Sequence, residues 1–116
     1  MRETKGDIHN LIQEAVHFLQ AGNPVAAERI AKRALLTHPR NFDALHVLGV
    51  ANACLGNNDK AILFYNKALR INGDHEEVRS NLGLAQAAAG KFEDALINFK
   101  KALSLNATNS DTYCLL

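Results

Sequence analysis

Cysteine, export signals and membrane-spanning segments are scarce or missing in this sequence. The 116 residues include two cysteines, Cys54 and Cys114. They form no Cys-x-x-Cys pair and no dense framework, so a reducing compartment is the simpler interpretation and a cytoplasmic location is predicted. No apolar run approaches the roughly 18 residues of a membrane helix. Residues 1–10 also lack the apolar core of a signal peptide. We therefore expect no membrane association.

An excess of charge of one sign is also lacking. Thirteen Lys and Arg residues against twelve Asp and Glu residues leave a net charge of +1. This balance argues against a nucleic-acid binder, which needs a basic stripe, and against an acidic solvating tail. Hydrophobic residues make up 47% of the chain, which is too many for a disordered protein and enough for a core.

The motifs of common enzymes are absent as well. The sequence contains no Gly-x-Ser-x-Gly, His-Glu-x-x-His, phosphate-binding loop or Gly-x-Gly-x-x-Gly pattern. We therefore predict that the chain is not an enzyme, has no catalytic residues and needs no cofactor.

What the sequence does contain is a repeat of 34 residues. Glycines superpose at 22, 56 and 90, and alanines superpose at 27, 61 and 95 and again at 34, 68 and 102. Repeats with this period favour stacked helical units, each too thin to bury its own apolar face. The three units span residues 8–41, 42–75 and 76–109, after a tail at 1–7.

Within each unit the apolar and small residues follow a helical period. Leu45, Leu48, Gly49 and Asn52 share one face of a helix. A glycine then closes that helix before a second one begins. The small residue at Gly49 predicts a close approach of the paired helices, with the large Tyr65 filling the space beside it. This pattern predicts an all-α chain of antiparallel helix pairs, with helices near 8–21, 24–37, 42–55, 58–71, 76–89 and 92–105.

The same columns resemble the tetratricopeptide repeat. That family has the pattern Trp-x2-Leu-Gly-x2-Tyr, then Ala-x3-Phe-x2-Ala, then Pro. Leu45-x2-Leu48-Gly49-x2-Asn52 follows the first part with two replacements, and Ala95-x3-Phe99-x2-Ala102 matches the second. Arg79 departs from the first column. The resemblance covers residues 8–116 and implies a right-handed superhelical solenoid of three repeats.

The resemblance also implies a concave groove, lined by the first helix of each pair, that takes a peptide or protein partner. No cation occupies the positions of the carboxylate clamp found in many chaperone-binding members, so we reject that clamp. Of an asparagine ladder, only Asn81 is present. The candidate groove residues are His9, Ile12, Val16, Asp43, His46, Val47, Val50, Glu77, Asn81 and Leu84.

The floor of this groove has two interpretations. Val16, Val50 and Leu84 form an apolar column that suits an apolar or basic peptide, or a helix laid in the groove. Alternatively, the three side chains simply pack against the neighbouring helix. His9, Asp43, His46 and Glu77 are of the types that bind zinc, but we interpret them as solvated surface groups and predict no metal site.

Residues 110–116 align with the start of a fourth repeat. No polar capping helix follows them, so we expect an exposed apolar end-face that favours self-association and a possible homo-oligomer through the terminal helices. Its candidate residues are Phe99, Leu103, Tyr113, Leu115 and Leu116. Either the chain is a short product whose last turn covers Phe99 and Leu103, or it is a fragment of a longer protein; we favour the fragment.

Three functions follow from these observations. The first is a non-catalytic scaffold or adaptor that binds a protein or peptide partner in the groove. The second is an N-terminal module of a larger enzyme, because residues 39–72 resemble bacterial repeat segments that precede sugar- or sulfo-transferase domains. The third is self-assembly through the end-faces.

Overall fold

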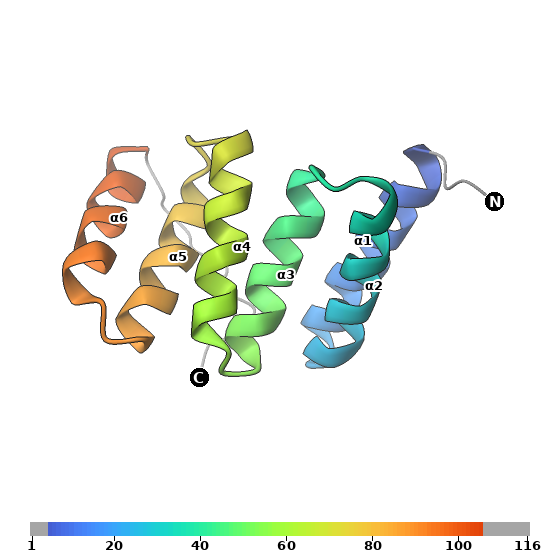
Figure 1. The fold of residues 1–116 in the computed structure, drawn as a ribbon, viewed down its shortest axis with the longest axis horizontal. Helices are drawn as coiled ribbons and strands as arrows, with labels where there is room; N and C mark the ends of the chain where they lie inside the picture. The colour runs from blue at the N-terminus through green and yellow to red at the C-terminus, as the bar shows by residue number, and fades with distance from the viewer. Residues whose placement is uncertain (1–4, 106–116) are drawn as a thin grey trace.

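The computed structural model describes residues 5–105, and it confirms the all-α prediction. Within this range the chain forms six helices and no strand. They stand side by side in a row that measures 45 × 25 × 23 Å over the chain, with α1 and α2 at one end and α6 at the other (Figure 1). The helices are α1 (Lys5–Gln20), α2 (Pro24–Thr37), α3 (Phe42–Cys54), α4 (Asn58–Ile71), α5 (Glu76–Ala88) and α6 (Phe92–Ser104).

The helix boundaries follow from local sequence signals. Pro24 opens α2 at a position where its missing N–H is not needed. The side chain of Asn41 accepts a hydrogen bond from the Ala44 amide and caps α3. Gly22, Gly56 and Gly90 have φ near +80° between the helices of each pair, a conformation that glycine adopts without steric cost. The only sizeable difference from the predicted boundaries is that α1 begins at Lys5 rather than at residue 8.

The helices form a curved stack. Each pair, α1/α2, α3/α4 and α5/α6, packs internally, and the next pair joins through α2/α3 and α4/α5. The first helices of the pairs also contact one another, α1 with α3 and α3 with α5. No such contact links α2 with α4 or α4 with α6 among the described helices. The stack therefore curves toward the side of α1, α3 and α5, which is the concave side.

Small residues let the helices of a pair approach closely, as the columns predicted. A methyl group on Gly83 would lie 2.7 Å from Cε1 of Phe99, and one on Gly49 would overlap the ring of Tyr65. Tyr65 is almost completely buried and belongs to the central hydrophobic cluster. The glycine on one helix and the aromatic ring on the other therefore pack in direct contact. A larger side chain at the glycine would displace the ring.

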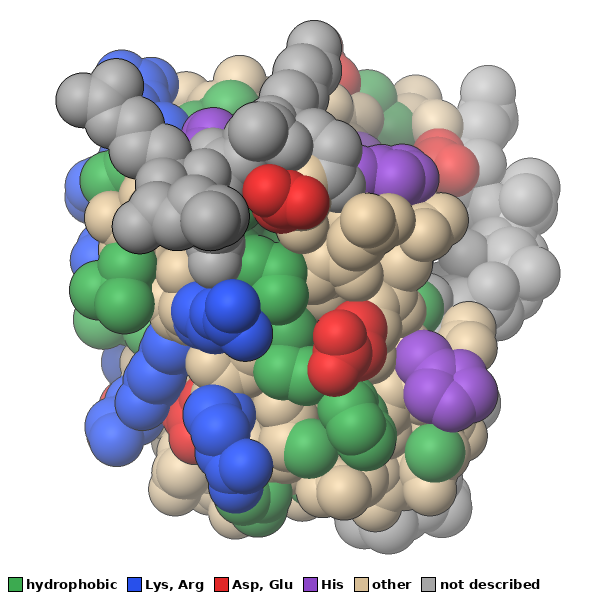
Figure 2. Space-filling model, turned by 90° about the vertical axis from the view of Figure 1, so that its right-hand side faces the viewer, with side chains coloured by type: hydrophobic (Ala, Val, Ile, Leu, Met, Phe, Trp, Pro, Cys, Tyr) green, Lys and Arg blue, Asp and Glu red, His purple; other side chains and the backbone are tan. Residues whose placement is uncertain are grey.

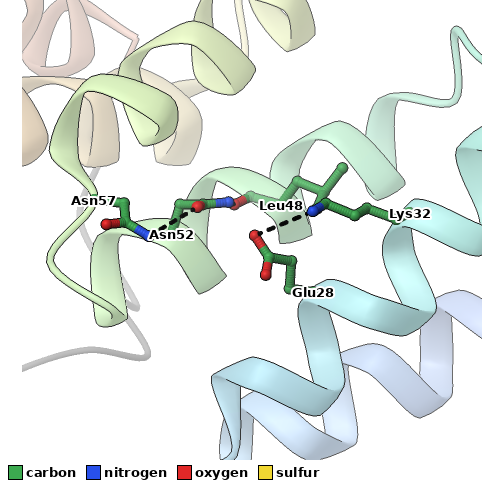
Figure 3. A network of polar contacts seen from close by, with 5 residues as sticks. All are labelled: Glu28, Lys32, Leu48, Asn52 and Asn57. Atoms are coloured by element: carbon green, nitrogen blue, oxygen red, sulfur yellow. Dashed lines mark hydrogen bonds and ion pairs between the residues drawn. The ribbon is translucent and has the colours of Figure 1, made fainter.

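A polar residue in the core, Asn52, stands where the family pattern has an aromatic residue. Asn52, fully buried, donates from Nδ2 to the Leu48 carbonyl at 2.8 Å, and Asn57 lies 3.5 Å from its Oδ1 (Figure 3). The same view shows the ion pair between Glu28 and Lys32 on α2, an exposed contact that contributes little to stability.

Arg79 begins a second polar network, which the sequence did not reveal. Its Nε donates to the Gly73 carbonyl at 3.1 Å and its Nη1 donates to Oδ1 of Asn98 at 3.1 Å. Asn98 donates in turn from Nδ2 to Oε1 of Gln86 at 2.8 Å. Leu45 and Phe64 hold the positions of Arg79 and Asn98 one repeat earlier, so the last helix pair uses polar contacts where the preceding pair uses apolar packing.

Candidate functional site

A cavity of about 220 Å³ opens on the concave side, between α1, α3 and the start of α5. Seven of the candidate groove residues line it; Leu19, which belongs to the next groove column of the sequence, also does, and His75 was missed. None of the lining residues is Lys or Arg. They are Ile12, Val16, Leu19, Asp43, His46, Val47, Val50, His75 and Glu77.

Not every predicted groove residue lines this cavity. His9 is exposed on α1 and lies outside it. Leu84 is 43% exposed on α5 and also lies outside it. Asn81 sits beside the cavity, with its Nδ2 3.3 Å from Nε2 of His46. The 34-residue spacing places Leu84 in the column of Val50, but within residues 5–105 no further helix follows α5 and α6 to cover it.

Part of the apolar floor packs against neighbouring helices, and part of it is open to a ligand. Val50 is 3% exposed and, like Val47, belongs to the central hydrophobic cluster, so both pack against neighbouring helices. Ile12 and Val16 on α1 are only partly buried and line the cavity. The part of the floor available to a ligand is therefore formed mainly by α1.

His75 has a structural role that its sequence position alone did not suggest. It is the N-cap of α5, and its Nδ1 accepts a hydrogen bond from the Val78 amide at 3.3 Å. Its ring lies 4.8 Å from the Phe42 ring and 5.6 Å from the His46 ring, measured between centroids. The cap position, directly before α5, brings His75 onto the surface of α3. Histidine is not among the residues favoured at helix N-caps, so no local sequence signal marked this role.

His46 is neutral at physiological pH. Burial lowers the pKa of His46 to about 4, and the charge of His75 adds to this effect. Nε2 of His46 lies 3.9 Å from Oε2 of Glu77, but a neutral ring forms no ion pair with that carboxylate. With its Nε2 unprotonated, His46 accepts the hydrogen bond from Asn81.

The cavity and its border present hydrogen-bond acceptors and negative charge. Asp43 is exposed and Glu77 is partly buried, and both contribute carboxylates. Oδ1 of Asn81, a residue 3% exposed, has no hydrogen-bond partner within the described part of the chain. Burial raises the pKa of the nearby Tyr65 hydroxyl, and the Glu77 charge raises it further, so this hydroxyl remains protonated. A ligand that supplies N–H donors or positive charge complements these groups.

The histidines and carboxylates of the groove do not gather into a metal-binding group. Four groove residues are of the types that bind zinc: His9, Asp43, His46 and Glu77. Among residues 7–105 no three His, Cys, Asp or Glu side chains come together in a way that holds a metal ion.

The predicted end-face is only partly visible. Phe99 is half-buried against Gly83 in the α5/α6 pair, whereas Leu103 is largely exposed. Tyr113, Leu115 and Leu116, together with the proposed partial repeat at 110–116, lie outside the described residues. None of the helices within residues 5–105 is both long and apolar enough to cross a membrane.

Three antiparallel helix pairs, stacked with a concave groove, define an α-solenoid. The family model of the tetratricopeptide repeat matches residues 12–76, and a second model of the same repeat matches residues 76–109. The chain belongs to the tetratricopeptide repeat family. A comparison with curated proteins gave no match.

Several solved structures share this fold. A point mutant of MamA is 26% identical with a TM-score of 0.78, over 85% of this chain and 72% of that chain. An O-GlcNAc transferase mutant from Thermobaculum terrenum is 28% identical with a TM-score of 0.85; 90% of this chain aligns with only 21% of that chain. The first repeat domain of Spaghetti (RPAP3), solved with a bound HSP90 peptide, is 19% identical with a TM-score of 0.86, over 94% and 86% of the two chains, and shows the fold alone.

Proposed function

We propose that this chain is a non-catalytic scaffold or adaptor that binds a protein partner in the groove formed by α1, α3 and α5. Membership of the tetratricopeptide repeat family supports this function. The observation that carries it is the cavity, where an apolar wall from α1 meets the carboxylates of Asp43 and Glu77.

The cavity favours one chemical class of ligand. Ile12 and Val16 offer apolar contact, while Asp43 and Glu77 offer negative charge. No lining residue supplies a cation, so an acidic peptide or a terminal carboxylate has no counter-charge there. We expect a peptide segment or helix that carries an apolar side chain next to Lys or Arg.

A peptide-display selection on the purified chain tests this proposal. Selected peptides are expected to combine an apolar residue with Lys or Arg, and each is then measured by fluorescence anisotropy. Glu77→Lys and Ile12→Arg are expected to weaken binding at least about tenfold, through charge repulsion and loss of apolar contact. Leu63→Arg is the matched control, because Leu63 is exposed on α4, away from the cavity.

Two results would overturn the groove proposal. One is a selection that enriches no peptide. The other is a set of peptides that bind the Glu77→Lys and Ile12→Arg variants as tightly as the unmodified chain, while circular dichroism shows all proteins folded.

A second candidate is a repeat module within a larger enzyme. The likeness to the Thermobaculum terrenum O-GlcNAc transferase favours it, because this chain aligns with 21% of that chain. The intact mass of the protein from its native cells distinguishes the two. A mass near 12.7 kDa supports a free-standing adaptor, and a much larger mass supports a module.

The cytoplasmic location stays a prediction. It rests on the two cysteines, which form no Cys-x-x-Cys pair and no dense framework.

A further inference from the structure

The outer helix of the last pair carries an apolar stripe that faces away from the core. Phe92, Leu96 and Leu103 are 70%, 53% and 70% exposed. They are separated by four and seven residues, so they lie along one side of α6. We call these three residues the α6 stripe, and we propose that two copies of this chain pair through it, with their α6 helices antiparallel about a two-fold axis.

The preceding repeat shows what such a stripe accommodates. Ile62 and Leu69 on α4 hold the positions of Leu96 and Leu103, and both are partly buried against the central cluster. That cluster includes Val78, Leu82 and Ala85 of α5, the helix that packs on α4. The surface of α4 that is equivalent to the α6 stripe is therefore covered by the apolar side of α5. Within residues 5–105 no helix covers the α6 stripe.

The α1 end of a second copy offers no apolar helix that could cover the α6 stripe in the same way. Three α1 residues hold the positions of the α5 residues that cover α4. They are all exposed and polar: Asn10, Glu14 and His17. Figure 2 looks at the end formed by α1 and α2 and shows charged and histidine side chains spread among apolar ones. Head-to-tail stacking would desolvate these polar groups against the α6 stripe. The apolar surface that matches the stripe is the stripe of another copy.

Charge along α6 selects the antiparallel arrangement. Glu93 and Lys100 are both exposed and are seven residues apart, so they border the α6 stripe on the same side. An antiparallel pair about a two-fold axis places Glu93 of each copy near Lys100 of the other. A parallel pair about a two-fold axis places this side of one copy on the opposite side of the contact from that of the other copy, so Glu93 does not meet Lys100. The antiparallel pair also sets Phe92 opposite the partner copy's Leu103.

The expected association is weak. A contact between two helices of about 20 Å length falls below the roughly 1,200 Å² at the low end of stable interfaces. We therefore expect a dimer that dissociates in the micromolar range or above, visible only in a concentration series.

Sedimentation velocity of the full 116-residue chain, from about 1 μM to about 1 mM, tests the proposal. The unmodified chain is expected to shift from monomer to dimer with concentration. Leu96→Glu is expected to raise the dimer dissociation constant at least about tenfold, because it places a charge at the centre of the contact. Leu63→Glu is the matched control, because Leu63 is 50% exposed on α4 and lies outside the stripe.

A charge exchange tests the two-fold geometry itself. Glu93→Lys and Lys100→Glu should each weaken self-association, because each brings like charges together. An equimolar mixture of these two variants should pair better than either alone, because every cross-contact then joins opposite charges.

Three outcomes would overturn the proposal. The first is an unmodified chain that stays monomeric at every concentration, which would mean that the stripe is covered in some other way. The second is equal weakening by Leu63→Glu and Leu96→Glu. The third is a mixture that associates no better than its components. Circular dichroism of each variant separates these outcomes from unfolding, and the peptide-binding groove is tested independently.

Discussion

Gly49 of α3 and Tyr65 of α4 occupy one continuous space. A methyl group at Gly49 would overlap the Tyr65 ring, and the same arrangement recurs between Gly83 and Phe99 one repeat later. Because the ring is buried, it has no room to move aside. The close approach of the paired helices therefore depends on a hydrogen atom at these two positions.

Substitution of these glycines is expected to destabilise the fold through overpacking. Gly49→Ala should lower the free energy of unfolding by about 1–3 kcal/mol, and Gly83→Leu should lower it by a few kcal/mol. Urea denaturation followed by circular dichroism measures both. Gly73→Ala serves as the control, because its nearest contact is an ordinary 3.4 Å from the Leu69 carbonyl. A Gly49→Ala chain as stable as the control would contradict this packing.

Val50→Glu is expected to unfold the chain rather than only to abolish partner binding. If Val50 were an open groove residue, this substitution would leave the fold intact, but Val50 is buried in the central cluster. A buried carboxylate without a partner is strongly unfavourable, by several kcal/mol. Thermal melting is the measurement. A native melting curve for this variant would show that Val50 is accessible after all.

The free energy of unfolding is expected to fall as the pH falls from about 6.5 to about 4, because the pKa of His46 is lower in the folded chain. Its pKa is about 4 in the folded chain and about 6.5 when unfolded. Between these values the unfolded chain binds a proton that the folded chain excludes, so the stabilisation is complete above pH 6.5 and is lost progressively below it. The 2.5-unit difference corresponds to about 3 kcal/mol.

Urea denaturation at pH 7, 6, 5 and 4 measures this dependence. His46→Gln should flatten the profile in that window. Asn10→Gln is the control, because Asn10 is exposed on α1 and does not titrate. Parallel profiles for the unmodified chain and His46→Gln would assign the pH dependence to other groups.

Arg79→Leu is expected to destabilise the chain although it restores the apolar residue of the earlier repeats. The change leaves the Gly73 carbonyl and Oδ1 of Asn98 without their donor, and Asn98 is buried. The expected loss is about 1–3 kcal/mol of unfolding free energy. Arg79→Lys should not restore it, because one ammonium group does not reproduce the guanidinium fork. Lys101→Leu, on the exposed side of α6, is the control and should change stability by less than about 0.5 kcal/mol.

The sequence predicted the elements and the pairing well because both depend on local signals. The spacing of Leu48, Gly49 and Asn52 specified a helix face, and the repeat columns predicted a small residue at Gly49 beside a large one at Tyr65. The glycine at residue 56 separates two helices whose observed boundaries lie within one residue of the predicted ones. Family membership followed from the same columns.

The groove was predicted less completely, because the covering of a helix face depends on its neighbours in space. Val16, Val50 and Leu84 share one column, yet one is partly buried, one is buried and one is exposed. The difference arises because each helix pair has different neighbours. His75 joined the cavity through the approach of α5 to α3, which no single-helix pattern contains.

The sequence by itself determined the helices, their caps, the repeat period and the small-against-large columns, because these depend on residues close in the chain or at a fixed spacing. Only the tertiary structure decided which side chains the next helix covers. It therefore decided the neutral state of His46, the polar network of Arg79 and the exposure of the α6 stripe, because burial and hydrogen bonding depend on contacts between helices.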